Sequence, residues 1–201
     1  MKPLLPLFPL ELVLFPGTSL PLHIFEPRYK ELIGECLEEK RPFGIVRAKG
    51  EGIADVGCTA EIVEVTKKYP DGKLDIVTEG RDRFEVLEVD EQRSFLRGDV
   101  FYFQDEAARA SEAQIAHVVK LHGEILALAG TEQNLPQSED RISFHLAASL
   151  PLDLDFKQTL LEMRSEPQRV EAITKAFEAI LPKLQRAMQA RQKAGGNGHV
   201  G

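Results

Sequence analysis

Cysteine is scarce in this chain, since only Cys36 and Cys58 occur among its 201 residues. The first lies in a segment with a helical pattern, and the second lies in a segment typical of a strand. Two cysteines placed in this way supply neither a disulfide framework nor a zinc site. We therefore expect two reduced thiols packed in the interior.

Long apolar runs are missing as well. No stretch reaches the roughly 20 apolar residues that a membrane-spanning helix needs. The apolar segment that follows Lys2 is interrupted by Pro3, Pro6 and Pro9. It also carries Glu11 and has no small-x-small cleavage site, so it does not fit a secretion signal. We expect a cytoplasmic protein that has no membrane partner.

The chain also has no excess of basic charge. Its 32 acidic residues outnumber the 25 Lys and Arg residues, which gives a net charge of −7 at pH 7. Proteins that bind nucleic acids concentrate Lys and Arg on one face to neutralise phosphates. The composition therefore argues against a nucleic-acid partner. With 43% hydrophobic residues, the chain can still bury a core of ordinary size.

No nucleotide-binding motif is present. The only Gly-Lys pair, Gly72-Lys73, is followed by Leu74, whereas a phosphate-binding loop ends in Gly-Lys-Ser or Gly-Lys-Thr. The string Gly196-x-Gly198-x-x-Gly201 matches the dinucleotide fingerprint, but it follows a helical segment and has no βαβ unit around it. We expect no cofactor.

Patterns for catalysis and metal binding are missing too. None of the serines lies in a glycine-flanked nucleophile elbow. The histidines form no His-Glu-x-x-His motif, and His117 and His122 are five residues apart, off a shared helical face. The acidic clusters around Glu35 and around Glu85 have the spacing of solvated faces. The sequence therefore predicts no catalytic residue and no metal site.

Proline, in contrast, is concentrated near the amino terminus. Five prolines lie between Leu5 and Tyr29 in an otherwise apolar stretch, and they forbid a continuous helix there. Short extended pieces joined by turns are expected instead. A helix is predicted to begin at Pro27, because Tyr29, Leu32, Ile33, Cys36 and Leu37 recur on one helical face.

The next part of the chain reads as strands. They are predicted at residues 43–47, 58–66, 74–78, 83–89 and 95–103. Asp71-Gly72 predicts a hairpin turn, because this pair accepts the positive φ of a tight connection. Apolar neighbours such as Ile62-Val63 and Val86-Leu87 break strict alternation, which indicates bulges or strands covered on both faces. A closed or nearly closed barrel fits this pattern best.

From Asp105 onward the pattern becomes helical. The first predicted helix ends near Gly130, a second begins at Ser138 as its cap, and Asp155 with Gln158 resembles a capping box for a third. Ser165 with Gln168 indicates a fourth helix, which Pro182 is expected to kink or split. We divide the chain into a β-rich subdomain (1–104), a helical bundle (105–193) and a flexible tail (194–201).

Several segments carry a family resemblance. They are Leu5–Leu10, Phe15-Pro16-Gly17 with Leu20–Tyr29, Asp55–Ile62, Asp71-Gly72 with Ile76–Phe84, and Leu150–Leu152 with Lys157–Glu162. In this order, over nearly the whole chain, they resemble the amino-terminal substrate-binding domain of the ATP-dependent Lon protease. The resemblance implies an α+β fold in which a PUA-like β-pseudo-barrel is followed by a C-terminal helical bundle. It also implies a stand-alone, bacterial-type member without ATPase or peptidase domains.

The resemblance, together with the missing motifs, predicts a non-catalytic module that binds unfolded or damaged polypeptides through an apolar groove. The candidate residues are Phe15, Pro16, Leu20, Pro21, Leu22, Ile24, Phe25 and Tyr29. Phe15-Pro16 and Leu20-Pro21 are the best candidates for exposure because they flank Gly17, although most of these residues individually also fit core packing. Addition of an extended peptide to a free strand edge is a second mode of binding.

The expected partners are unfolded or damaged polypeptides, together with a separate Lon-type protease or a chaperone, and the oligomeric state stays open. Two alternative functions remain. An RNA-binding module is one, because PUA-like barrels elsewhere handle RNA, although the acidic balance opposes it. A hydrolase in its own right is the other, because proteins that contain this domain are often described as proteases.

Overall fold

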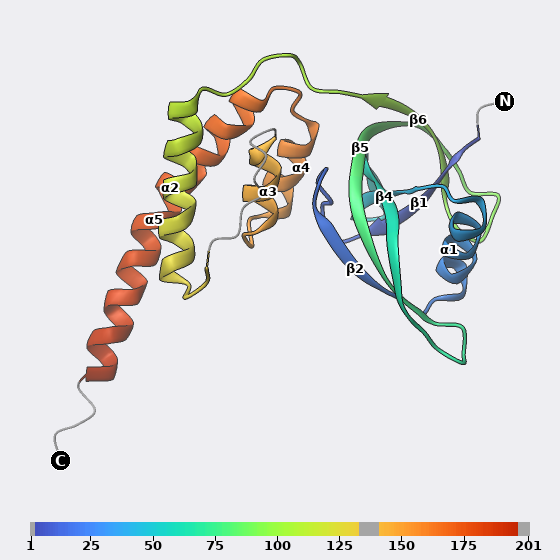
Figure 1. Cartoon of the computed structure of the whole chain (residues 1–201), viewed down its shortest axis with the longest axis horizontal. Helices are drawn as coiled ribbons and strands as arrows, with labels where there is room; N and C mark the ends of the chain where they lie inside the picture. The colour runs from blue at the N-terminus through green and yellow to red at the C-terminus, as the bar shows by residue number, and fades with distance from the viewer. Residues whose placement is uncertain (1–2, 133–140, 197–201) are drawn as a thin grey trace. The chain divides into compact units, whose positions relative to one another are not determined.

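The computed structural model describes residues 3–132 and 141–196. Their contacts divide the chain into two compact units (Figure 1). The first, called the β unit here, contains residues 3–104 and 148–162. The second, called the helical unit, contains the other described residues.

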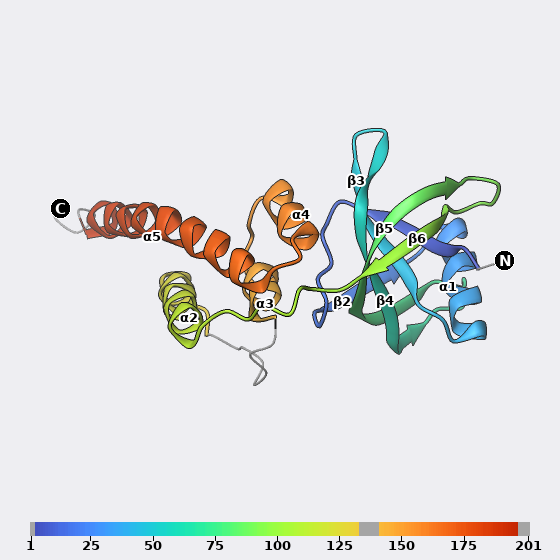
Figure 2. The ribbon, with the colours of Figure 1, turned by 90° about the horizontal axis from the view of Figure 1, so that it is seen from above.

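Six strands form one sheet in the β unit: β1 (Leu5–Leu10), β2 (Ser19–Ile24), β3 (Phe43–Lys49), β4 (Gly52–Lys68), β5 (Leu74–Asp90) and β6 (Arg97–Phe103). The sheet order is β2-β5-β4-β3-β1-β6, and β6 also pairs with β5. Strands β1, β3, β4, β5 and β6 therefore close into a barrel, which Figure 2 shows from above. The expected α+β fold with a PUA-like pseudo-barrel is confirmed.

One strand is longer than the sequence indicates. Residues 74–78 and 83–89 were expected as two strands, but both belong to the continuous strand β5. Its first half pairs with β2 and its second half pairs with β6, so each half gains a partner without a break in the chain. Shifts in register between Ile62 and Glu64 and between Val86 and Glu88 confirm the bulges that the apolar pairs predict.

Buried apolar side chains from four strands fill the barrel. Leu5 and Leu7 of β1 pack with Val46, Phe84 and Val100 of the neighbouring strands, and all five are buried. β1 runs parallel to β3 through Leu7–Leu10 and antiparallel to β6 through Leu5 and Pro6. The proline-rich start of the chain is therefore part of the core.

Helix α1 (Pro27–Glu39) begins as predicted, with Pro27 in its first turn. Tyr29, Leu32, Ile33 and Cys36 are buried, which confirms the predicted apolar face. The Asp71-Gly72 hairpin between β4 and β5 is confirmed as well. Gly72 has a φ of 79°, and the amide of Tyr69 donates to the carbonyl of Lys73.

Helix α4 (Leu154–Glu162) belongs to the β unit and packs against β4. The Gln158 side chain donates to the carbonyl of Val56 at 3.0 Å, and Arg83 of β5 donates to the carbonyl of Leu161 at 2.8 Å. The cap of this helix differs from the expected one. The carboxylate of Asp153, not that of Asp155, accepts bonds from the first amides of the helix.

The helical unit contains α2 (Glu112–Leu128), α3 (Ile142–Ala148) and α5 (Glu166–Gly196). A capping box of Ser111 and Gln114 starts α2, and Gly130, with a φ of 70°, follows its end as predicted. α5 starts directly after Ser165, as expected. Pro182 does not split α5, because the helix continues through it to Gly196.

A buried arginine joins the parts of the helical unit. The Arg169 guanidinium is fully buried and donates to both carboxylate oxygens of Asp105, to Glu166 and to the hydroxyl of Ser143. It also lies 4.2 Å from the ring centroid of Phe144. This network ties the segment before α2 to α3 and α5, and it places two carboxylates beside one buried cation.

The predicted domain borders at residues 104 and 193 stay predictions, and the structure adds that residues 148–162 group with the strands. The expected cap Ser138 lies outside the described residues. The same is true of residues 197–201, which make up most of the predicted tail and of the glycine string.

Candidate functional site

The eight candidate residues lie on β2, on the turn before it and at the start of α1. Phe15 is only 1% exposed, and Pro16, Ile24 and Tyr29 are buried too. Leu20 and Leu22 are half-buried and Pro21 is exposed. Phe25 is also exposed, with 56% of its surface open to solvent.

The expectation that Phe15-Pro16 would be exposed is wrong, and the turn around Gly17 gives the reason. The carbonyl of Phe15 accepts hydrogen bonds from the hydroxyl and the amide of Thr18. The amide of Gly17 donates to the carbonyl of Gly80 on β5, and the amide of Gly80 donates back to Thr18. These bonds hold the turn against β5, so the Phe15 ring faces the core.

Gly80 makes this close approach possible. A Cβ atom at this position would lie 2.1 Å from the carbonyl oxygen of Phe15. Since real contacts are never that short, only glycine fits here without a shift of the backbone. The sequence shows a glycine within a strand segment at Glu79-Gly80-Arg81, but it does not indicate that Phe15 is the residue that approaches it.

Four of the candidate residues, Leu22, Ile24, Phe25 and Tyr29, line one cavity of about 300 Å³. Its other apolar walls come from Phe8, Pro9 and Leu10 at the end of β1. We call this hollow the β1–β2 cavity. Sequence reasoning found its β2 side but missed Phe8, Pro9 and Leu10, because they read as ordinary strand core.

Stacked rings form two walls of the β1–β2 cavity. The rings of Phe8 and Tyr29 lie 3.8 Å apart between centroids and are nearly parallel, and Phe25 stacks on His23 at 5.8 Å. The guanidinium of Arg28 lies 4.6 Å from the centre of the Tyr29 ring. Burial raises the pKa of the Tyr29 hydroxyl, and nearby Arg28 partly offsets that rise, so this side chain is neutral at physiological pH.

Charged groups at the rim of the cavity are neutralised locally. Arg28 pairs with Glu26 at 2.9 Å. His23 Nδ1 lies 2.5 Å from one oxygen of Asp75, and the hydroxyl of Tyr69 donates to the other oxygen at 2.8 Å. The bonds from His23 and then from Tyr69 lower the pKa of Asp75. Each of these rim groups therefore already has a partner close by.

The free edge of β2 is a poorer site than this cavity. β2 pairs only with β5 among the described strands, and Pro21 lies in its middle, opposite Val77. Proline has no amide hydrogen to donate to an added strand, and proteins use it to blunt exposed edges. Side-chain binding in the β1–β2 cavity is thus favoured over strand addition.

Three side chains that suit metal binding do not come together anywhere in residues 3–132 and 141–196. Over the same residues, no helix combines the length and the apolar character that crossing a bilayer requires. Cys36 and Cys58 are both buried and neither forms a disulfide, as expected.

Comparison with known proteins places this architecture. A family model described as the ATP-dependent protease La (LON) substrate-binding domain matches residues 4–178. The chain belongs to this family. The match begins just before β1 and ends within α5, so the barrel and the β1–β2 cavity both lie inside the Lon substrate-binding domain.

Similar proteins include two curated Lon proteases. Lon protease 1 of Hydrogenovibrio crunogenus is 24% identical over 193 residues, which cover 87% of this chain and 23% of that protein. Lon protease of Parabacteroides distasonis is 34% identical over 110 residues, which cover 50% of this chain and 13% of that protein. The chain therefore spans about a quarter or less of the length of these relatives.

Two solved structures are similar as well. The crystal structure of a Lon N-terminal domain protein from Xanthomonas campestris has a TM-score of 0.68 at 26% identity and covers 84% of this chain and 95% of that one. The N-terminal domain of a Mycobacterium avium complex Lon protease has a TM-score of 0.63 at 14% identity, with 88% and 98% covered. The second likeness shows the fold alone.

Proposed function

We propose that this Lon-type domain is a non-catalytic recognition module that holds unfolded or damaged polypeptide segments in the β1–β2 cavity. The observation that carries the proposal is Phe25, a large apolar side chain left 56% exposed beside an open apolar cavity. Exposed apolar surface next to a hollow is typical of binding sites. The family's description as a substrate-binding domain supports the same assignment.

The size and the charge of the cavity indicate what it holds. About 300 Å³ is the lower end of the range for ligand pockets, enough for one or two large side chains rather than for a folded surface. Arg28 is paired with Glu26, and Asp75 is bonded to His23 and Tyr69, so these polar rim groups are already engaged with one another. Such a cavity suits the apolar side chains that unfolded segments expose.

The absence of catalysis is part of the proposal. Among the side chains that line the cavity, His23 is the best suited to act as a general base. Its ring is hydrogen-bonded to Asp75 and stacked on Phe25. The ring therefore forms part of the cavity wall. We also propose that the domain works in the cytoplasm with a separate Lon-type protease or a chaperone that receives the bound segments.

The test measures binding of fluorescein-labelled, unfolded casein by fluorescence anisotropy. We expect the parent to bind, Phe25→Asp to lose at least ten-fold in affinity, and Val63→Asp to bind like the parent. Val63 is the matched control, since it is an exposed apolar side chain on β4 that does not line the cavity. Failure of the parent to bind casein, or equal losses in both variants, would overturn the proposal.

A peptidase assay with and without ATP tests the non-catalytic part separately. We expect labelled casein to stay intact over hours of incubation. Turnover that disappears in Phe25→Asp but persists in Val63→Asp would show that the domain is a hydrolase and would end the non-catalytic assignment.

A further inference from the structure

A second exposed apolar surface lies on the outer face of the β5–β6 ribbon. Leu87 is 61% exposed and Phe101 is 52% exposed. Phe101 lies opposite Glu85 in the register, and Leu87 follows two residues after Glu85, at the bulge. Bulges re-aim side chains and are common at functional surfaces. We call Glu85, Leu87, Glu88, Asp99 and Phe101 the ribbon patch.

The arrangement of the carboxylates in the ribbon patch lowers the stability of the sheet. Glu88 and Asp99 lie directly opposite each other on adjacent strands, and like charges in this position destabilise a sheet. Neither of them, nor Glu85, forms an ion pair with any residue that the structure describes. Asp90, two residues beyond Glu88, is in contrast paired with Arg97 at 2.9 Å.

The ribbon patch therefore combines two features that folding alone does not favour: large apolar side chains in solvent and unpaired like charges beside them. Both are relieved by one kind of partner. An apolar side chain that covers Leu87 and Phe101 removes apolar area from water, and a cation placed near Glu88 and Asp99 ends their repulsion.

We propose that the ribbon patch is a docking site for a polypeptide segment that carries Lys or Arg next to a large apolar side chain. Charge complementarity selects this partner, since three unpaired carboxylates repel acidic segments and gain nothing from neutral ones. The β1–β2 cavity, whose rim charges are paired, makes no such selection. The domain thus has two surfaces with different preferences.

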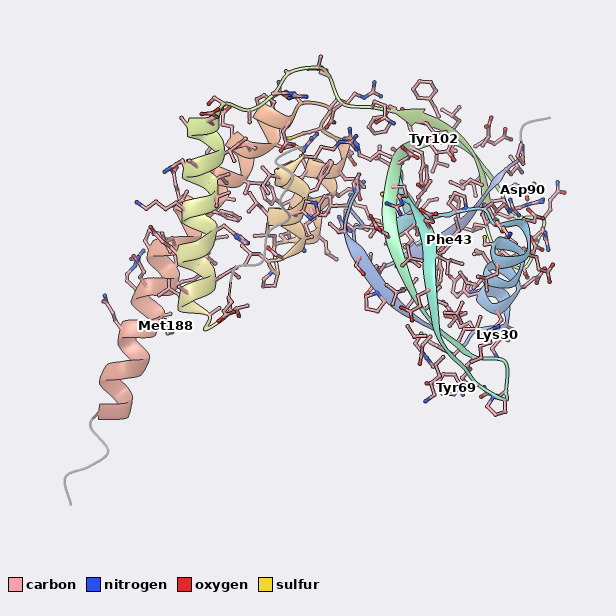
Figure 3. All side chains as sticks on the ribbon, in the orientation of Figure 1. Lys30, Phe43, Tyr69, Asp90, Tyr102 and Met188 are labelled. Carbon is pink, nitrogen blue, oxygen red and sulfur yellow. The ribbon has the colours of Figure 1, made fainter. Side chains whose placement is uncertain are left out.

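The two surfaces lie at separate places on the β unit. Tyr69, which contacts His23 at the rim of the cavity, and Tyr102, which adjoins Phe101, are at opposite ends of the strands in Figure 3. The ribbon patch can therefore be altered without touching the cavity, and its test is independent of the proposed function.

The experiment uses three fluorescein-labelled ten-residue peptides and anisotropy at 50 mM NaCl. The first alternates Lys with Leu and Phe, the second has Glu in place of Lys, and the third has Ser in place of the apolar residues. In the Phe25→Asp background, in which the β1–β2 cavity is blocked, we expect only the first to bind, and this binding weakens as NaCl rises to 500 mM because the charges are screened. Phe101→Ser should lower its affinity about ten-fold, because the main apolar contact is lost.

Substitutions of the carboxylates separate a binding role from a structural one. Glu88→Gln should raise the midpoint of thermal unfolding by about 1–3 °C, because it removes the like-charge pair, and lower affinity for the first peptide about two- to five-fold. Glu64→Gln on β4 is the matched control and should change neither. A more stable protein that binds less tightly is the signature of a binding residue.

Three results would overturn this proposal. One is equal binding of the Lys and Glu peptides in the Phe25→Asp background, and another is a Glu88→Gln substitution in that background that leaves binding of the first peptide unchanged. The third is self-association of the parent, measured by sedimentation, that Phe101→Ser abolishes while no peptide binds, because a second copy would then be the occupant. Phe25→Asp should keep the part of the binding of the first peptide that Phe101→Ser removes.

Discussion

One substitution made at two positions tests the division between core and site. Phe15→Ala and Phe25→Ala remove the same ring from residues ten positions apart on the same apolar stretch. Phe15 is 1% exposed, so its loss leaves a cavity and should cost about 3–5 kcal/mol of unfolding free energy. Phe25 is 56% exposed, so less than half of its roughly 200 Å² is at stake. At about 25 cal/mol per Å², its loss should cost about 1–2 kcal/mol.

The chain offers a convenient signal for this measurement. It has no tryptophan and three tyrosines, and Tyr29, Tyr69 and Tyr102 all belong to the β unit. Tyrosine fluorescence during urea unfolding therefore reports the unit that contains both substitutions, whereas circular dichroism also follows the helices. We expect a large drop in the urea midpoint for Phe15→Ala and a small one for Phe25→Ala, with similar slopes.

Binding supplies the other half of the test. Binding is measured without urea, at a temperature at which both variants are folded. Phe25→Ala should then bind unfolded casein more weakly than the parent, and Phe15→Ala should bind it like the parent. The reasoning fails if the two variants lose similar stability, or if Phe15→Ala, while folded, is the one that loses binding. Either result would mean that the Phe15 ring is a contact surface rather than part of the core.

Three further outcomes follow from single residues. Gly80→Ala should lower the free energy of unfolding by about 1–3 kcal/mol, because its Cβ would lie 2.1 Å from the Phe15 carbonyl oxygen. An unchanged urea midpoint would contradict the close approach. Burial raises the pKa of the Cys36 thiol to about 11, so at pH 8 only about 0.1% is thiolate. We therefore expect Cys36 to react slowly with a disulfide reagent at pH 8 and faster towards pH 10 and in urea. Fast labelling of the folded protein at pH 8 would refute this expectation. Arg169→Leu should destabilise the helical unit by about 3–5 kcal/mol, since it removes the buried cation beside Asp105 and Glu166. Circular dichroism during urea unfolding measures this loss of stability. A loss below about 1 kcal/mol would contradict the role of the network.

Local patterns in the sequence predicted local structure well. The buried face of α1 follows from the spacing of Tyr29 to Cys36, and the β4–β5 turn follows from Asp71-Gly72. Both depend on residues that are near one another in the chain, where periodicity and turn chemistry act directly.

Contacts between distant residues were beyond the reach of such patterns. Phe15 was expected to be exposed because it flanks Gly17, yet it is buried because Gly17 bonds to Gly80, 63 residues away. The predicted bundle includes the segment of α4, and the structure adds that Gln158 of this helix bonds to Val56, 102 residues away. Half of the candidate residues do line the β1–β2 cavity, but its β1 wall depends on how β1 folds back beside β2 and α1, which no local pattern encodes.

The return of α4 to the strands has an evolutionary consequence. The polypeptide passes between the two units three times, after residues 104, 147 and 162. A gene fragment that ended at the last strand would lack the segment whose side chain meets Val56 and whose backbone meets Arg83. A contiguous segment that carries every strand together with these α4 contacts therefore runs at least as far as residue 162.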